Sequence, residues 1–261
     1  MNDRERPIGV FDSGVGGVSV LRKLRLAAPM ENIIYFGDSA NAPYGEKSSE
    51  QVRELTFSGV EKLLSLGAKA ILVACNTATG AAVRLLREKY PSLPIVGIEP
   101  AIKPAVLYGE NELGKTDGSS RVLVMATPVT ISQAKFAHLS EEFKDRAEII
   151  PLPCPHLAEL IEQGDPDSPE IKEYLSQLLS PYSDVDSVVL GCTHYPFVGR
   201  QIAAVLPNAK LFDGGEGTAK EALRRTSASG LNNVSGKRGE VTFISSKDEE
   251  TALLYRKFFE M

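Results

Sequence analysis

Two cysteines stand at the same point of two similar segments of the sequence. Residues 70–79 read Ala-Ile-Leu-Val-Ala-Cys-Asn-Thr-Ala-Thr, and residues 187–196 read Ser-Val-Val-Leu-Gly-Cys-Thr-His-Tyr-Pro. An aliphatic run that ends in a small residue, a cysteine and short polar residues is typical of a buried parallel strand. Because ligands of open α/β sheets bind at the carboxyl ends of the strands, the spacing predicts two thiols, Cys75 and Cys192, that face one site from opposite sides.

Two facing thiols suit the movement of a proton across a carbon atom. A thiolate is a base as well as a nucleophile, and its ordinary pKa of about 8.5 responds to a helix N-terminus or to a nearby charge. One cysteine with one histidine would favour covalent acyl transfer. Two cysteines favour removal of a proton from one side of a carbon and its return from the other side, which inverts a stereocentre. Asp12, Glu162 and His194 are the candidates to take or give the protons of the thiols.

The two segments close two similar cycles of alternating strands and helices. The first cycle opens with a predicted strand that ends at Phe11 and closes at Cys75, 64 residues later. The second opens with a strand that ends at Met125 and closes at Cys192, 67 residues later. We therefore expect two pseudo-symmetric α/β lobes with mostly parallel sheets and an active site in the cleft between them.

The segment after the second cycle is expected to return to the first lobe. It contains two further predicted strands and a helix, and its place in the sequence favours this return. We assign residues 1–98 and 210–261 to a first α/β domain that carries Cys75. Residues 99–209 form the second α/β domain, which carries Cys192.

Two loops at predicted strand ends are candidate binding segments. Residues 12–17, Asp-Ser-Gly-Val-Gly-Gly, form a Gly-rich turn before a helix, where backbone N–H groups can hold an anion. The same glycines also suit a simple tight turn, and the turn lacks the lysine and spacing of a nucleotide-binding P-loop. Residues 37–45 are rich in turn-forming residues, which predicts a surface loop that either connects two elements or carries function.

Composition excludes several classes of partner. The net charge of −5 argues against a nucleic-acid partner. No apolar run reaches the length of about 18 residues that a membrane helix needs, and the first residues lack the apolar core of a signal peptide. Three cysteines make no disulfide framework. These features predict a cytoplasmic protein with reduced thiols.

Two other classes of function stay open on the residues alone. Cys154-x-His156 and Cys192-x-His194 could bind a metal, although their spacing differs from common zinc motifs. A noncatalytic protein could instead bind a small anion with the Gly-rich turn. It would bind its ligand without turnover. Cys154 lacks the setting at a strand end and is expected to be an inert buried residue.

Four motifs, in this order along the chain, resemble the glutamate racemase family. They are Asp-Ser-Gly-Val-Gly-Gly at 12–17, Pro-Tyr-Gly at 43–45, Cys-Asn-Thr-Ala at 75–78 and Gly-Cys-Thr-His-Tyr-Pro at 191–196. The resemblance extends over nearly the whole chain. The Thr-His pair after the second cysteine is the discriminating detail, since aspartate racemases usually carry Thr-Glu there.

The resemblance implies an isomerase that interconverts L- and D-glutamate without a cofactor or a metal. Such an enzyme is cytoplasmic and supplies D-glutamate for peptidoglycan synthesis, and so for cell-wall biogenesis and cell shape. Its partner is the small-molecule substrate rather than a nucleic acid or a membrane, and its expected assembly is a homodimer. Family members that need a cell-wall precursor as activator tend to carry a longer N-terminal extension, so we predict no such activation here.

The resemblance also implies roles for individual residues. Cys75 and Cys192 are the two bases, Asp12 assists Cys75, and His194 with Glu162 assists Cys192. Glu159, one helical turn before Glu162, is the alternative, and Pro128 leaves open where Thr130 lies. The carboxylates and the ammonium group of the substrate are held by a wider set: Asp12, Ser13, Pro43, Tyr44, Gly45, Asn76, Thr77, Thr130, Thr193 and His194.

Overall fold

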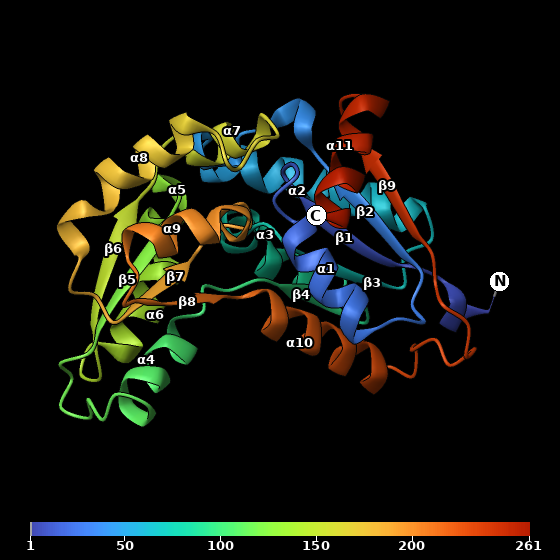
Figure 1. The fold of residues 1–261 in the computed structure, drawn as a ribbon. Helices are drawn as coiled ribbons and strands as arrows, with labels where there is room; N and C mark the ends of the chain where they lie inside the picture. Colours follow the sequence, from blue (N-terminus) through green and yellow to red (C-terminus); the bar gives the residue numbers. More distant parts are fainter. Residues whose placement is uncertain (1) are drawn as a thin grey trace. The chain divides into compact units, whose positions relative to one another are not determined.

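The computed structural model describes residues 2–261, which form two compact units (Figure 1). The first unit contains residues 2–99 and 215–261, and the second contains residues 100–214. Each unit is built around one sheet of parallel strands with helices, as predicted for the α/β class. Among residues 2–261, no helix is both long enough and apolar enough to cross a membrane.

The sheet of the first unit has the strand order β4-β3-β1-β2-β9, and every neighbouring pair is parallel. Its strands are β1 (Ile8–Asp12), β2 (Ile33–Gly37), β3 (Ala70–Val73), β4 (Ile95–Gly97) and β9 (Val241–Ser245). Strands β1 and β3 are buried along their whole length, and apart from Asp12 at the end of β1 they contain only aliphatic residues, phenylalanine and glycine. In the register of the sheet, Phe11 of β1 lies opposite Val73 of β3.

Five α-helices belong to the first unit: α1 (Val18–Ala27), α2 (Ser49–Ser65), α3 (Asn76–Lys89), α10 (Gly215–Ala228) and α11 (Glu249–Glu260). Short 3-10 helices lie at Asp3–Glu5 (η1), Ser39–Asn41 (η2) and Tyr44–Glu46 (η3). Helices α2 and α3 pack on one another, while α1 packs on α10 and α11. The chain moves from β1 to β2 in one direction and from β2 to β3 in the other. Right-handed crossovers therefore place α1 and α2 on opposite faces of the sheet.

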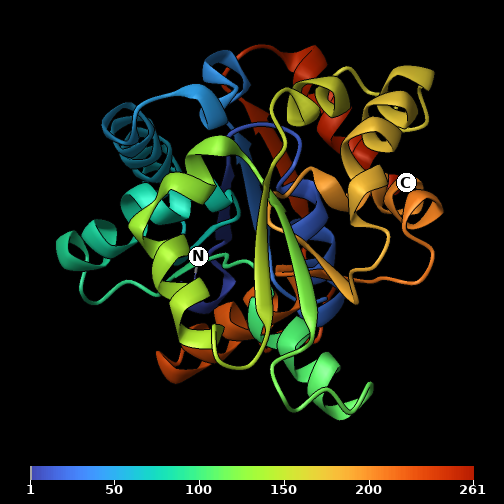
Figure 2. The same cartoon turned by 90° about the vertical axis from the view of Figure 1, so that its left-hand side faces the viewer.

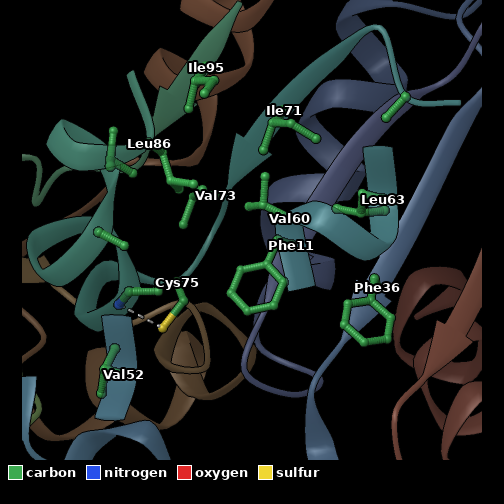
Figure 3. Packing of buried hydrophobic residues seen from close by; sticks show 14 of the residues in the cluster. Phe11, Phe36, Val52, Val60, Leu63, Ile71, Val73, Cys75, Leu86 and Ile95 are labelled. Carbon is green, nitrogen blue, oxygen red and sulfur yellow. Dashed lines mark hydrogen bonds between the residues drawn. The ribbon is translucent and has the colours of Figure 1, made fainter. Parts of the chain in front are cut away.

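A hydrophobic cluster under α2 and α3 fixes the end of β3 (Figure 3). The ring of Phe11 lies close to α2 at Gly59, where a Cβ atom would lie 2.2 Å from the ring. Burying a phenylalanine of this kind contributes about 2–3 kcal/mol. Cys75 belongs to the same cluster, so packed neighbours hold the cysteine backbone in place.

The sheet of the second unit has the order β6-β5-β7-β8, again parallel throughout. Figure 2 shows β5 and β6, in green and yellow, side by side. Its strands are β5 (Arg121–Ala126), β6 (Glu148–Pro153), β7 (Ser187–Leu190) and β8 (Lys210–Asp213). Its helices are α4 (Ile102–Asn111), α5 (Pro128–Ser132), α6 (Ala134–Phe143), α7 (Leu157–Glu162), α8 (Pro169–Leu179) and α9 (Gly199–Val205), with 3-10 helices η4 (Ser180–Tyr182) and η5 (Tyr195–Val198).

The predicted return of the chain to the first domain at residue 210 is wrong. Strand β8 pairs with β7, and Phe212 packs against the core of the second unit. The apolar pair Leu211-Phe212 therefore extends the second sheet, and the chain returns to the first unit at Gly215. Helices α4 and α11 had no counterpart in the sequence prediction.

Candidate active site

Each cysteine follows a strand at the point where the order of its sheet reverses. In the first unit the chain leaves β1 toward β2 and leaves β3 toward β4, so the switch point lies between β1 and β3. In the second unit the switch point lies between β5 and β7. Ligands of open α/β sheets bind at such points, beyond the carboxyl ends of the strands. Cys75 follows β3 and Cys192 follows β7, so the two thiols occupy equivalent positions of two similar sheets.

The residue before each cysteine makes the same backbone contact. The N–H of Ala74 donates to the carbonyl of Phe11 at 2.7 Å, and the N–H of Gly191 donates to the carbonyl of Met125 at 2.7 Å. A Cβ atom on Gly191 would lie 2.8 Å from the Met125 carbonyl oxygen, so this position requires glycine. These bonds carry the sheet geometry one residue beyond the strand and set the direction of each cysteine.

Cys75 is buried and caps the N-terminus of α3. Its sulfur accepts a hydrogen bond from the N–H of Ala78 at 3.5 Å, drawn as a dashed line in Figure 3. Backbone N–H groups and the positive end of the helix dipole stabilise a negative charge at this place. The local structure therefore suits a cysteine that works as a thiolate.

Asp12 ends β1, the strand next to β3, and its side chain is fully buried. One carboxylate oxygen, Oδ1, accepts a hydrogen bond from the N–H of Gly14 at 2.9 Å. A Cβ atom on Gly17 would lie 2.5 Å from Cβ of Asp12, so the Gly-rich turn makes room for this carboxylate. Ser13 is also buried in the turn. The structure thus places Asp12 and Cys75 at the carboxyl ends of neighbouring strands.

Tyr44 is buried in the loop after β2, with Pro43 and Gly45 half-buried on either side. Its hydroxyl donates to Oδ2 of Asp38 at 2.6 Å, and Nδ2 of Asn41 donates to the same carboxylate at 3.0 Å. Burial, the hydrogen bond to Asp38 and the negative charges nearby raise the pKa of Tyr44 far above its usual value. The phenol therefore stays neutral. Asp38 was not among the predicted site residues, although it directly follows β2 at the same end of the sheet where Asp12 ends β1.

The first turn of α3 offers polar groups beside Cys75. Asn76 and Thr77 are both buried there. Within residues 2–261, the side-chain oxygen of Asn76 is buried without a hydrogen-bond partner. A buried acceptor of this kind costs free energy unless a ligand donor meets it. The ammonium group of an amino acid would supply such a donor.

Cys192 heads a chain of three polar side chains. Its sulfur lies 3.6 Å from Nδ1 of His194, and Nε2 of His194 lies 2.7 Å from Oε1 of Glu162. His194 is almost fully buried, and the Glu162 side chain is 23% exposed. The imidazole can therefore exchange a proton with the thiol while the carboxylate holds the ring in place.

The pKa of His194 lies well above its ordinary value. Burial lowers it, but the hydrogen bonds to Cys192 and Glu162 and the charges of both groups outweigh the burial. A charged imidazole donates from both ring nitrogens, so it can hold a thiolate on one side and a carboxylate on the other.

The structure distinguishes the two glutamates of α7. His156 precedes the helix with a φ of 60°, and its Nδ1 lies 3.2 Å from Oε2 of Glu159 on the surface. Glu162, one turn later, is the residue that contacts His194. The sulfur of Cys154 donates to the carbonyl of Leu152, whereas His156 contacts Glu159, so the two side chains have different hydrogen-bond partners. Burial raises the pKa of Cys154 to about 12, which keeps this thiol protonated.

Thr130 and Thr193 are both buried beyond the ends of β5 and β7. Pro128 occupies the first position of α5, where a helix tolerates proline. Thr127 caps this helix and its hydroxyl donates to Oγ1 of Thr130 at 3.0 Å. The proline therefore leaves Thr130 in the first turn of a helix at the switch point of the second sheet.

Comparison with known proteins gives the family. The family model described as Asp/Glu/hydantoin racemase matches residues 8–222. The chain belongs to this racemase family. A curated glutamate racemase from Clostridium acetobutylicum is 45% identical over 264 residues, covering 100% of both chains. The predicted resemblance to glutamate racemases, which are amino-acid isomerases, is therefore confirmed.

Solved racemase structures agree with this placement. A glutamate racemase from Francisella tularensis in complex with D-glutamate has a TM-score of 0.83 and 30% identity, and the match covers 99% of this chain and 95% of that one. A glutamate racemase from Thermus thermophilus in complex with β-chloro-D-alanine has a TM-score of 0.80 and 35% identity, with 98% and 94% covered. The fold of this racemase is thus that of glutamate racemases over its whole length.

Proposed function

We propose that this racemase interconverts L- and D-glutamate by proton transfer between two cysteines, with no cofactor. The observation that carries the proposal is the equivalence of Cys75 and Cys192, each of which follows the strand at the switch point of a parallel sheet. A thiol at both positions fits a reaction that needs a base and an acid of the same kind. The relatives named glutamate racemase support glutamate as the substrate.

From L-glutamate, Cys192 is the base. Its thiolate takes the α-proton, and the electron pair of the C–H bond stays on the α-carbon. The Cys75 thiol then gives a proton to the opposite face, which forms D-glutamate and leaves Cys75 as the thiolate. His194 stabilises the Cys192 thiolate at the start, because its ring lies 3.6 Å from the sulfur and Glu162 favours its charged form.

From D-glutamate the roles are exchanged. The Cys75 thiolate at the N-terminus of α3 takes the α-proton, and Cys192 gives one to the other face. Asp12 assists at Cys75 as Glu162 and His194 assist at Cys192. Each turnover ends with the protonation states of the two thiols exchanged, so turnover in the opposite direction, or proton exchange with solvent, restores them.

The polar groups around the cysteines are proposed to hold the substrate. The unpaired oxygen of Asn76 suits the ammonium group. The loop of Pro43, Tyr44 and Gly45 would bind the distal carboxylate, and Ser13, Thr77, Thr130 and Thr193 would complete the site. We expect β-chloro-D-alanine, the ligand of the Thermus thermophilus relative, to bind here through its α-centre alone, because it has no distal carboxylate.

Circular dichroism tests this function. Purified protein, dialysed free of small molecules, is incubated with L-glutamate, with D-glutamate and with L-aspartate. We expect both glutamate signals to decay to zero and the aspartate signal to persist. Tight binding of glutamate without decay would show a noncatalytic binding protein and overturn the proposal.

The biological setting belongs to the same proposal. D-Glutamate is expected to feed peptidoglycan synthesis, and hence cell-wall formation and cell shape. Working thiols favour the cytoplasm as the compartment, because it keeps cysteines reduced. We expect a homodimer in solution, which sedimentation at equilibrium would check.

A further inference from the structure

The end of the chain holds the loop that carries Tyr44. Strand β9 lies beside β2, and α11 follows it in the first unit (Figure 1). We call residues 241–261, which form β9 and α11, the C-terminal brace. The N–H of Ala40 donates to Oγ of Ser246 at 3.0 Å, and the N–H of Ser246 donates to the carbonyl of Gly37 at 3.0 Å. The brace thus contacts the loop at residues 37–45 close to its start.

Tyr255 of α11 adds a buried hydroxyl to these contacts. Its Oη donates to the carbonyl of Gly37 at 3.2 Å and lies 2.7 Å from Oγ of Ser39. A phenol has one proton, so while it donates to Gly37 it accepts from Ser39. Tyr255 is fully buried, and a hydrogen bond shielded from water fixes its partners more firmly than one on the surface.

Tyr255 lies too close to Gly37 for any side chain at residue 37. A Cβ atom on Gly37 would lie 2.4 Å from the hydroxyl oxygen of Tyr255. The ring of Tyr255 packs edge-on against Tyr35, with 5.2 Å between the ring centres, and Tyr35 donates to the carbonyl of Gly14 in the Gly-rich turn. This edge-on pair of tyrosines therefore contacts both the Gly-rich turn and the loop at residues 37–45.

We propose that Tyr255 is a positioning residue for glutamate recognition, acting through the loop at residues 37–45. The inference rests on the proposed function, in which Tyr44 and Gly45 bind the distal carboxylate. The hydroxyl of Tyr255 fixes the start of this loop at Gly37 and Ser39, and Asp38 between them holds Tyr44. A shift at this point moves the carboxylate-binding end of the site and leaves the cysteine after β3 where it is.

Tyr255→Phe removes the hydroxyl and keeps the ring against Tyr35. We expect KM for glutamate to rise about three- to tenfold, the size of one hydrogen bond, with kcat little changed. The inhibition constant of β-chloro-D-alanine, which has no distal carboxylate, stays at the parent value. A purely structural defect would instead lower the amount of active enzyme, and with it kcat. Tyr90→Phe is the matched control, since it removes a hydroxyl that contacts surface Glu61 in the same unit, and it leaves all three constants unchanged.

Ser39→Ala tests the same contact from the loop side and serves if Tyr255→Phe folds poorly. The double variant should resemble Tyr255→Phe, because the contact that Ser39→Ala removes is already lost with the Tyr255 hydroxyl. An unchanged KM overturns the inference, and so does a fall in kcat alone or an equal rise in KM and in the inhibition constant of β-chloro-D-alanine. If the parent protein does not racemise glutamate, the proposed function fails instead, so the two failures are distinguishable.

Discussion

Replacing Glu162 by glutamine removes a negative charge from beside His194 and keeps the size of the side chain. The amide oxygen can still accept from Nε2 of His194, where the carboxylate now lies at 2.7 Å. A charge-assisted hydrogen bond is about twice as strong as a neutral one, so the loss is about 1 kcal/mol. That loss lowers the pKa of His194 and makes the Cys192 thiolate less favourable, which corresponds to about fivefold in rate.

The substitution is expected to slow proton transfer through Cys192 and to leave proton transfer through Cys75 unchanged. Because L- and D-glutamate have an equilibrium ratio of one, kcat/KM for racemisation must fall equally in both directions. Elimination of chloride from a glutamate analogue with a chlorine atom on its β-carbon reports on each cysteine separately, because it needs only the first deprotonation. We expect Glu162→Gln to slow elimination from the L-analogue, through Cys192, about fivefold. Elimination from the D-analogue, through Cys75, should keep its parent rate.

The pKa of His194 gives a second readout, from NMR titration of the imidazole. The raised pKa contributes stability in full below the usual histidine pKa of about 6.5, and this stability is lost as the pH rises through the folded-state value. Glu162→Gln should lower that pKa, while Glu159→Gln should not, because Glu159 contacts His156. Equal effects of the two variants, or an unchanged His194 titration in Glu162→Gln, would refute the reasoning.

Three further results are expected. Racemisation should survive a strong chelator and carbonyl reagents that trap pyridoxal phosphate, because the thiol pair needs no electron sink. Loss of activity that a metal ion or pyridoxal phosphate restores would contradict this. Glutamate should have a far larger kcat/KM than aspartate, because a shorter substrate leaves the carboxylate-binding loop at Tyr44 unpaired; similar values would disprove it. Lys69→Met should cost about 3–5 kcal/mol in urea unfolding, since it leaves Glu31, 3% exposed and 2.5 Å from Nζ, as an unpaired buried charge. Lys89→Met, in an exposed pair with Glu61, should cost little, and an equal loss for both would refute the assignment.

The repeated cysteine pattern predicted the positions of both thiols because its physical cause is local. A buried parallel strand needs a continuous apolar run, and the polar residues that follow lie at the ligand-binding end of the sheet. The positions of Cys75 and Cys192 at strand ends could therefore be predicted from the residues next to them in the sequence. The same holds for Asp12, which directly follows the apolar residues of β1.

Local sequence patterns could not predict contacts between segments that are distant in the sequence. The two glutamates of α7 lie one turn apart, and nothing in their local sequence tells which of them contacts His194; in the structure Glu162 does, while Glu159 contacts His156. Strand β8 was assigned to the wrong sheet, because a short apolar strand carries no sign of its partner. Tyr255 contacts Ser39 across 216 residues, and although Asp248 marks the start of its helix, nothing local indicates the loop that it holds.

Separate replacement of the two thiols tests the central claim most directly. Cys75→Ser and Cys192→Ser keep the shape of the site, but a hydroxyl is hardly ionised at neutral pH, so each variant should lose racemisation in both directions. With the β-chloro analogue of glutamate, Cys75→Ser should still eliminate chloride from the L-form through Cys192, and Cys192→Ser from the D-form through Cys75. If both variants process the same enantiomer, or if Cys75→Ser racemises glutamate at the parent rate, the two-thiol mechanism is wrong.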